Sequence, residues 1–162
     1  MSSVMQRKGG LPGWLKPANR MIVALQRLLG LSIGTIHVLS VPGRKSGKLR
    51  TTPVSLMVID GKRYVVGGLP DADWVRNARS AGWGILAYGR KVERVALVEL
   101  PEHDRAPILR QFPRLVPHGV HFFERLYALP KDPARLPEVF EQLASTCPVF
   151  RIDPAQRGLL RD

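Results

Sequence analysis

The sequence VPGRKSGKLRTTP, residues 41–53, lies between two apolar runs that are rich in β-branched residues, 37–41 and 54–59. Its glycines at positions 43 and 47 permit a tight, exposed excursion of the backbone, which is typical of a turn between two antiparallel strands. Four of the eight residues from 43 to 50 are lysine or arginine. The stretch therefore predicts a β-hairpin with a basic tip.

Such a hairpin is suited to holding a phosphate or a carboxylate, because cationic side chains and uncovered backbone N–H groups converge there. A basic loop in a basic protein is also commonly a solvated turn without a ligand. The spacing excludes a nucleotide P-loop, which needs four residues between its glycines and a hydroxyl residue after the lysine. Here three residues separate the glycines, and Leu49 follows Lys48.

The length and composition describe an ordinary single domain. A chain of 162 residues, 44% of them hydrophobic, can bury one substantial core. The single cysteine, Cys147, excludes an intramolecular disulfide, and no apolar stretch approaches the length of a membrane span. Residues 21–33 are interrupted by Gln26 and Arg27 and lack a small-residue cleavage site, unlike a signal peptide. We expect a reduced, cytoplasmic protein.

The charge is strongly positive and unevenly distributed. The net charge is +12, and residues 1–50 contain nine lysines or arginines and no acidic residue. Such a field attracts polyanions, so nucleic acid, an anionic membrane surface and a small polyacidic molecule are all compatible partners. A nucleic-acid module is the weakest of these readings, because aromatic residues are only 7% of the chain and are not interleaved with the basic run.

The N-terminal part has two segments of different character. Residues 1–16 have few periodic apolar positions and are predicted to form a flexible basic arm. From Pro17 to Gly30, apolar residues recur at helical spacing, which predicts an amphipathic helix with Leu25 and Leu29 on its apolar face. This helix is interpreted as a cover for one end of a sheet; the alternatives are docking on a membrane surface and lining a lipid-like substrate pocket.

Six later segments have the composition and alternation of strands: 36–41, 52–59, 64–66, 84–88, 92–100 and 148–152. Helical spacing is found at 74–81, where Asp71 is the expected N-cap, and at 104–112, 120–129 and 138–145. Strands in succession with helices gathered late predict an α+β, mainly β fold: a small antiparallel barrel with short helices across its mouth. We expect a single domain, 17–154, and a polar tail, 155–162.

The side chains offer little chemistry of their own. His118 and His121 have a spacing that allows metal binding on a helix, but a third ligand is missing, so no metal is predicted. Cys147 has no CxxC partner, and Ser46 is not in a nucleophile elbow. No catalytic side chain is predicted, and a bound cofactor is expected to supply the chemistry. Trp74 and Asn77 are candidates to contact a planar ring, with a core role the alternative for Trp74.

The string from Gly43 to Val54, followed by Asp60-Gly61, a Tyr-Val-Val strand and Trp74-Val75-Arg76-Asn77, resembles the deazaflavin-dependent nitroreductase family. This family belongs to the split β-barrel flavin and deazaflavin oxidoreductases of actinobacteria. The resemblance covers residues 36–100 and, more weakly, 147–153. It implies a six-stranded split β-barrel and binding of coenzyme F-420, an 8-hydroxy-5-deazaflavin whose tail carries a phosphate and several glutamates.

The resemblance also implies which residues contact the coenzyme. The phosphate and the start of the tail would be held by the hairpin residues Arg44, Lys45, Ser46, Gly47, Lys48 and Arg50. The ring would lie along Thr52, Pro53 and Val54 and be closed on the other side by Gly67, Gly68, Trp74 and Asn77. The implied activity is hydride transfer from reduced F-420 to an electrophilic organic acceptor.

Two departures from the family pattern adjust these expectations. The loop 67–73 lacks a family lysine and carries two acids, Asp71 and Asp73, which implies weaker binding or a different route for the acidic tail. The last helix lacks the tyrosines of members that reduce nitroimidazoles, so that activity is not transferred. Its more apolar character suits a hydrophobic electrophile such as a quinone, an enone or a nitro compound, with a substrate pocket formed by Leu25, Leu29, Tyr127 and Phe140.

We therefore expect an F-420-dependent oxidoreductase, monomeric or homodimeric, without nucleic acid and with a peripheral contact to the inner face of an anionic membrane. Two alternatives stay open. The same barrel can hold FMN in the same groove, and the chain can be a non-catalytic protein that binds the deazaflavin or a lipid.

Overall fold

The computed structural model of the chain describes residues 35–155. The predicted arm 1–16, the predicted helix 17–30 with Leu25 and Leu29, and all but the first residue of the predicted tail lie outside the described residues. The described strands are β1 (Ile36–Pro42), β2 (Leu49–Ile59), β3 (Lys62–Val66), β4 (Trp83–Tyr88), β5 (Lys91–Glu99) and β6 (Val149–Pro154).

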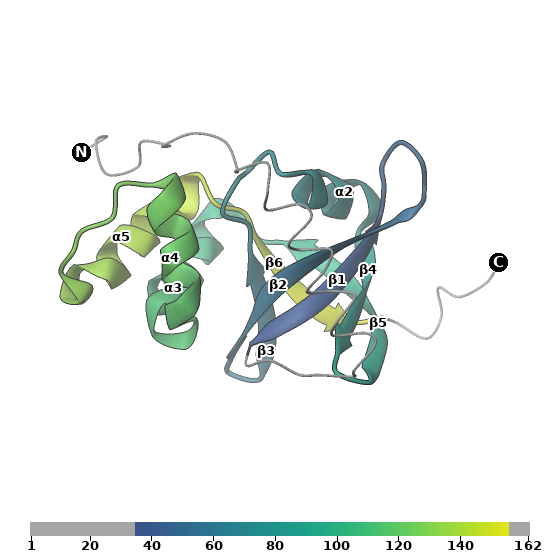
Figure 1. Cartoon of the computed structure of the whole chain (residues 1–162), viewed down its shortest axis with the longest axis horizontal. Helices are drawn as coiled ribbons and strands as arrows, with labels where there is room; N and C mark the ends of the chain where they lie inside the picture. The colour runs from purple at the N-terminus through teal and green to yellow at the C-terminus, as the bar shows by residue number, and fades with distance from the viewer. Residues whose placement is uncertain (1–34, 156–162) are drawn as a thin grey trace.

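The six strands form one closed antiparallel barrel in the order β1-β2-β3-β6-β5-β4 (Figure 1). The β1–β2 and β2–β3 connections are hairpins, and Asp60 and Gly61 both have positive φ, as a two-residue turn of the primed type requires. The last strand, β6, pairs with β3 on one side and β5 on the other. The structure thus confirms the predicted six-stranded antiparallel barrel.

The barrel interior is filled by alternate residues of all six strands and by one helix. Helix α2 (Asp73–Ala81) places Val75 and Ala78 in the same buried cluster as Leu39, Leu56 and other inward residues. Gly82, with φ 71°, ends the helix and donates its N–H to the carbonyl of Ala78. Helix α2 therefore closes the barrel at the end where the β1–β2 hairpin projects (Figure 1).

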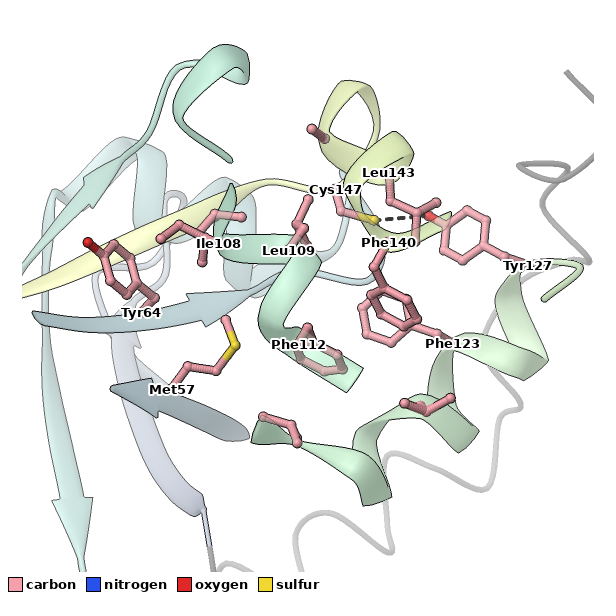
Figure 2. Packing of buried hydrophobic residues seen from close by; sticks show 14 of the residues in the cluster. Met57, Tyr64, Ile108, Leu109, Phe112, Phe123, Tyr127, Phe140, Leu143 and Cys147 are labelled. Carbon is pink, nitrogen blue, oxygen red and sulfur yellow. Dashed lines mark hydrogen bonds between the residues drawn. The ribbon is translucent and has the colours of Figure 1, made fainter. Parts of the chain in front are cut away.

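A second core lies outside the barrel wall, beneath three helices: α3 (Glu102–Leu115), α4 (Pro117–Leu126) and α5 (Leu136–Gln142), the last continued by a 3-10 turn, η3 (Leu143–Ser145). Met57 and Tyr64 face each other across β2 and β3 and point to this side, whereas their neighbours Leu56 and Val65 point inward. The aromatic rings of Phe112, Phe123 and Phe140 pack together at its centre (Figure 2).

Three details of the sequence prediction need correction. The late helices pack on the outside of the barrel wall, and the mouth is closed by α2 instead. Helix α3 continues through Pro113 to Leu115, because Phe112 and Leu115 pack into the outer core there. Asp71 is not the N-cap of α2; Ala72 takes that position and no side chain caps the helix.

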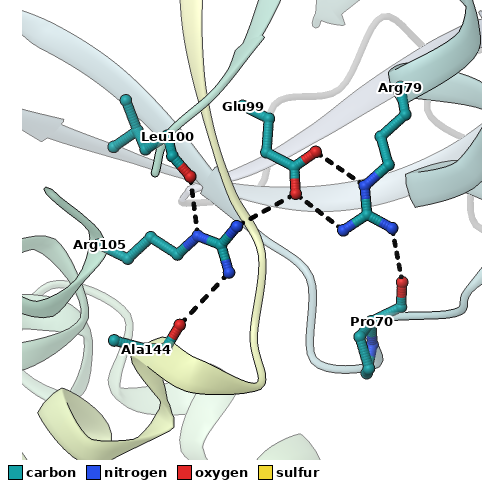
Figure 3. A network of polar contacts seen from close by, with 6 residues as sticks. All are labelled: Pro70, Arg79, Glu99, Leu100, Arg105 and Ala144. Carbon is teal, nitrogen blue, oxygen red and sulfur yellow. Dashed lines mark hydrogen bonds and ion pairs between the residues drawn. The ribbon is translucent and has the colours of Figure 1, made fainter. Parts of the chain in front are cut away.

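A network around Glu99, at the end of β5, joins α2 to the helical layer (Figure 3). Arg79 of α2 donates two hydrogen bonds of 2.7 Å to the Glu99 carboxylate. Arg105 of α3 donates to the same carboxylate at 3.3 Å and to the carbonyls of Leu100 and Ala144. The hydrogen bond from Arg79 is the main reason why the pKa of Glu99 lies below its ordinary value.

The described part of the chain, residues 35–155, contains no helix long and apolar enough to cross a membrane.

We expect Phe140→Ala to lower the free energy of unfolding by about 3–5 kcal/mol, because it leaves a cavity between Phe112 and Phe123 in the outer core. Denaturant unfolding followed by circular dichroism measures this loss. The control is Val92→Ala, since that side chain is 66% exposed and its truncation should change stability by less than about 0.5 kcal/mol. A loss under about 1 kcal/mol for Phe140→Ala would contradict the packing.

Glu99→Gln is expected to destabilise the protein by roughly 1 kcal/mol at neutral pH, because the carboxylate is partly exposed and its pairing partly screened. The folded-state pKa of Glu99 is lowered, so its contribution is complete above the unfolded-state pKa and is lost as the pH falls below about 4. Unfolding curves from pH 7 to pH 3 should therefore converge for the two proteins at the acid end. Glu138→Gln, at an exposed carboxylate, should show a much smaller difference; equal pH dependence in all three proteins would contradict the assignment.

Candidate anion-binding hairpin and ring site

The candidate site begins at the loop between β1 and β2, residues 43–48, which extends past the barrel beside α2 (Figure 1). The N–H of Gly43 donates to the carbonyl of Lys48 and the N–H of Gly47 to the carbonyl of Gly43, both at 2.8 Å. Gly47 has φ 71°, a conformation that favours glycine. The loop is thus a tight turn with a defined backbone, as the sequence indicated.

The backbone amides of this loop are less available to a ligand than the sequence suggested. Besides the two glycine amides, the N–H of Arg44 donates to Asn77 Oδ1 at 3.1 Å and that of Lys48 to Ser46 Oγ at 3.3 Å. Only the amides of Lys45 and Ser46 have no partner among residues 35–155. Recognition of an anion here therefore depends mainly on side chains.

Arg44 is a structural anchor of the hairpin. Its Nη1 donates to Asn77 Oδ1 at 2.9 Å and its Nη2 to Asp73 Oδ1 at 3.2 Å. Asn77 lies on α2, is only 4% exposed, and accepts hydrogen bonds from both the backbone and the guanidinium of Arg44. Asn77 thus ties the hairpin to the helix that closes the barrel. The sequence expectation, in which Arg44 contacts the coenzyme's phosphate and Asn77 contacts its ring, stays a prediction.

The other hairpin cations are exposed and unpaired within the described chain. Lys45, Lys48 and Arg50 have no acidic partner among residues 35–155, and Leu49 between the last two is 49% exposed. Three positive charges within residues 45–50, on the loop and the start of β2, repel one another unless counterions or an anionic ligand lie near them. This is the structural observation that fits a phosphate-bearing group.

The residues expected along the ring differ in how much surface they present. Thr52 and Pro53 are half-buried on β2, next to the hairpin, whereas Val54 is 8% exposed and belongs to the barrel interior. Trp74 of α2 is half-buried and packs against Phe150, with ring centroids 5.7 Å apart. Thr52, Pro53 and Trp74 therefore keep surface that a planar ring can contact, while Val54 does not.

Gly67 and Gly68 are buried, and each leaves room for neighbouring side chains. A Cβ on Gly67 would lie 2.9 Å from Val75 Cγ2, and one on Gly68 would lie 2.5 Å from Phe122 Cε1. The carbonyl of Gly68 accepts the hydroxyl of Tyr127 at 2.6 Å. Close packing between the barrel and helices α2 and α4 thus accounts for both glycines without a cofactor.

Tyr127 and Phe140, expected in the substrate pocket, are each 0% exposed in the outer core (Figure 2). Their side chains have no surface with which to meet a substrate, so we do not carry them into the proposed pocket. Cys147 lies beside Tyr127, and burial raises the pKa of its thiol to about 11, as expected for an unreactive cysteine.

His118 and His121 have separate partners. His118 Nε2 lies 3.2 Å from Thr35 Oγ1, and His121 pairs with Glu124. Within residues 35–155 there is no group of three or more histidine, cysteine, aspartate or glutamate side chains arranged to hold a metal ion.

The contact between Asp73 and the hairpin was not predicted from the sequence. A signal was present, because Asp73 and Asn77 are four residues apart and therefore lie on one face of a helix. The spacing places the Asp73 carboxylate and the Asn77 amide on the face of α2 that contacts Arg44. What the sequence could not indicate is which loop this face would contact.

Comparisons with known proteins identify the fold. No family model and no curated protein matches the chain, but solved structures do. One, described as a domain-swapped dimer, has 19% identity and a TM-score of 0.51, covering 85% of this chain and 99% of its own. An F-420-H2-dependent reductase, FDR-A, has 21% identity and a TM-score of 0.50, covering 74% and 94%. An FAD-binding protein from Mesorhizobium loti has 17% identity and a TM-score of 0.50, covering 82% and 90%.

The chain therefore has the split-barrel fold that flavin and deazaflavin oxidoreductases use. At these identities the likeness establishes the fold, which is the one that the sequence resemblance implied. The site adds a cationic hairpin anchored to the helix that closes the barrel. Such an arrangement can bind an anionic group at the loop and a flat ring beside β2 and α2.

Asn77→Ala should destabilise the protein by about 1–2 kcal/mol and speed hydrogen exchange at the Arg44 amide, because two donors lose their acceptor. Exchange rates measured by NMR test this, with Arg76→Ala, at the exposed neighbouring position, as the control. Asn77→Asp keeps the acceptor and should restore the protection of Arg44. Unchanged protection in Asn77→Ala would show that the hairpin does not depend on this contact.

Proposed function

We propose that the protein is an oxidoreductase that binds coenzyme F-420 with the 43–50 hairpin and passes hydride to a hydrophobic electrophile. The proposal depends on three exposed cations, Lys45, Lys48 and Arg50, which have no acidic partners among residues 35–155. They lie on the 43–50 hairpin, which is fixed to α2. The shared fold with an F-420-H2-dependent reductase supports it.

In this proposal the protein's residues bind and orient. Lys45, Lys48 and Arg50 hold the phosphate and the first acidic groups of the tail through charge-assisted hydrogen bonds. Ser46 and Gly47 shape the turn, and Arg44 and Asn77 keep it in place. Thr52, Pro53 and Trp74 provide contact area for the ring.

In this proposal the bound deazaflavin supplies the hydride. The protein's contribution to rate is then proximity, orientation and exclusion of water around the reacting atoms. A quinone, an enone or a nitro compound is the proposed acceptor class, because the family resemblance implies an electrophilic organic acceptor. Tyr127 and Phe140, which are buried in the outer core, are not placed in its pocket.

We further propose a cytoplasmic protein that is monomeric or homodimeric. A structural neighbour described as a domain-swapped dimer supports the dimer, and the absence of acids from residues 1–50 supports a peripheral contact with an anionic membrane.

A flavin in the same site is a second candidate, because one structural neighbour is an FAD-binding protein. FMN, with a single phosphate, would occupy the hairpin without a long acidic tail. Absorption of the purified protein in the flavin bands, or binding of added FMN, identifies this case. A carrier without catalytic activity would bind reduced F-420 but never transfer its electrons to menaquinone analogues or nitro compounds.

The test is a fluorescence titration of the protein with F-420. Wild type should bind with micromolar or tighter affinity, and Lys45→Ala and Arg50→Ala should each weaken binding about five- to tenfold through the loss of one charged contact. Oxidation of reduced F-420 by a menaquinone analogue then measures activity.

The matched control is Arg90→Ala. Arg90 is an exposed cation on the β4–β5 turn, which lies beside the start of β1 and so at the opposite end of the barrel from the hairpin. Its removal lowers the net charge equally but should leave F-420 affinity within about twofold of wild type. Absence of binding by the wild-type protein, or equal losses in Arg90→Ala and Arg50→Ala, refutes the proposed site.

A further inference from the structure

The ion pair between Arg44 and Asp73 places a negative charge at the edge of the cationic hairpin. Arg44 Nη2 and Asp73 Oδ1 are 3.2 Å apart, and the Asp73 side chain is 76% exposed against 28% for Arg44. Asp73 is the first residue of α2, on the same helix face as Asn77. An ion pair so exposed adds little to stability. Its position beside the cationic hairpin suggests a role in ligand binding.

The contacts of Arg44 show what a ligand would meet. The backbone N–H and Nη1 of Arg44 are both directed to Asn77, which is buried, so these two donors are committed to holding the hairpin. Its Nη2 is directed to the exposed Asp73. An anion that takes the place of Asp73 on this Nη2 donor displaces the carboxylate, whose charge stays nearby afterwards.

Repulsion from a fixed carboxylate grows with the number of negative charges on the ligand. A single phosphate at Lys45, Lys48 and Arg50 meets three cations and one acid at the edge. A ligand with further negative groups extending toward α2 brings each of them close to Asp73. The penalty is therefore larger for polyanions than for a compact anion.

We propose that Asp73 is a specificity-determining residue that reduces the affinity of the hairpin for polyanions more than for anions with one phosphate. This inference rests on the proposed function, which assigns the hairpin as the binding site for the cofactor's phosphate. It states how negative charge is distributed on the ligand: one phosphate lies at the hairpin cations, and further acidic groups extend away from the α2 side.

The test compares inorganic phosphate and tripolyphosphate as probes on wild type and Asp73→Asn. The substitution keeps the size and an oxygen acceptor for Arg44 and removes only the charge. Titrations followed by the NMR signals of the hairpin amides at low ionic strength should show affinity increases of about threefold for phosphate and about tenfold for tripolyphosphate. At 0.5 M salt both gains should nearly vanish.

Asp60→Asn is the control. Asp60 lies in the β2–β3 turn, at the far end of β2 from the hairpin, and its φ of 50° suits asparagine. It removes the same charge from the protein and should change neither affinity. Denaturant unfolding of the two variants confirms that both remain folded.

The inference is overturned if Asp73→Asn does not raise the affinity, if it raises the affinity for both anions equally, or if the increases persist at 0.5 M salt. It is also overturned if Asp60→Asn gives the same increases, or if none of the proteins binds either anion.

The outcome is separable from the proposed function. If the anion gains occur but neither wild type nor variant binds F-420, the proposed function fails alone. If F-420 binds and Asp73→Asn changes nothing, the charge selectivity fails alone.

Discussion

Closure of the barrel by β6 is the constraint on which the rest of the structure depends. The last strand pairs with β3 and β5, so the sheet has no free edge among the described strands and its interior is enclosed. An enclosed interior needs its ends covered, and α2 covers one with Val75 and Ala78. That requirement fixes where α2 lies and, through Asn77, where the hairpin lies.

The helical layer and the barrel are joined at two buried or half-buried points. At the first point, Phe122 packs closely against Gly68, whose carbonyl accepts a hydrogen bond from the Tyr127 hydroxyl. At the second, the Glu99 carboxylate accepts hydrogen bonds from arginines of α2 and α3. These contacts connect the outer core to the helix beside the candidate site. The helix beside the site is therefore held in place by these contacts. The hairpin cations take no part in them and stay exposed.

Much of the fold could be predicted because strand and helix periodicities are local properties. Local residue types indicated the Asp60-Gly61 turn and the end of α2 at Gly82, where the backbone has positive φ. The structure confirms all six predicted strands. The predicted end of the helix before Pro113 was wrong, because a helix can continue through a proline when the neighbouring residues gain enough burial. The burial of Tyr127 and Phe140 in the outer core could not be predicted, because burial depends on which helices pack together and periodicity does not specify that.

The sequence by itself determined the basic hairpin, its position between two strands, and the set of cations it carries, because these depend on residue identity and nearest neighbours. Only the tertiary structure decided which of those cations are available. Arg44 is held by Asn77 and Asp73, thirty residues or so away along the chain, while the side chains of Lys45, Lys48 and Arg50 have no acidic partner among residues 35–155. The physical reason is that a side chain's partner depends on the closure of the barrel, which brings α2 against the loop.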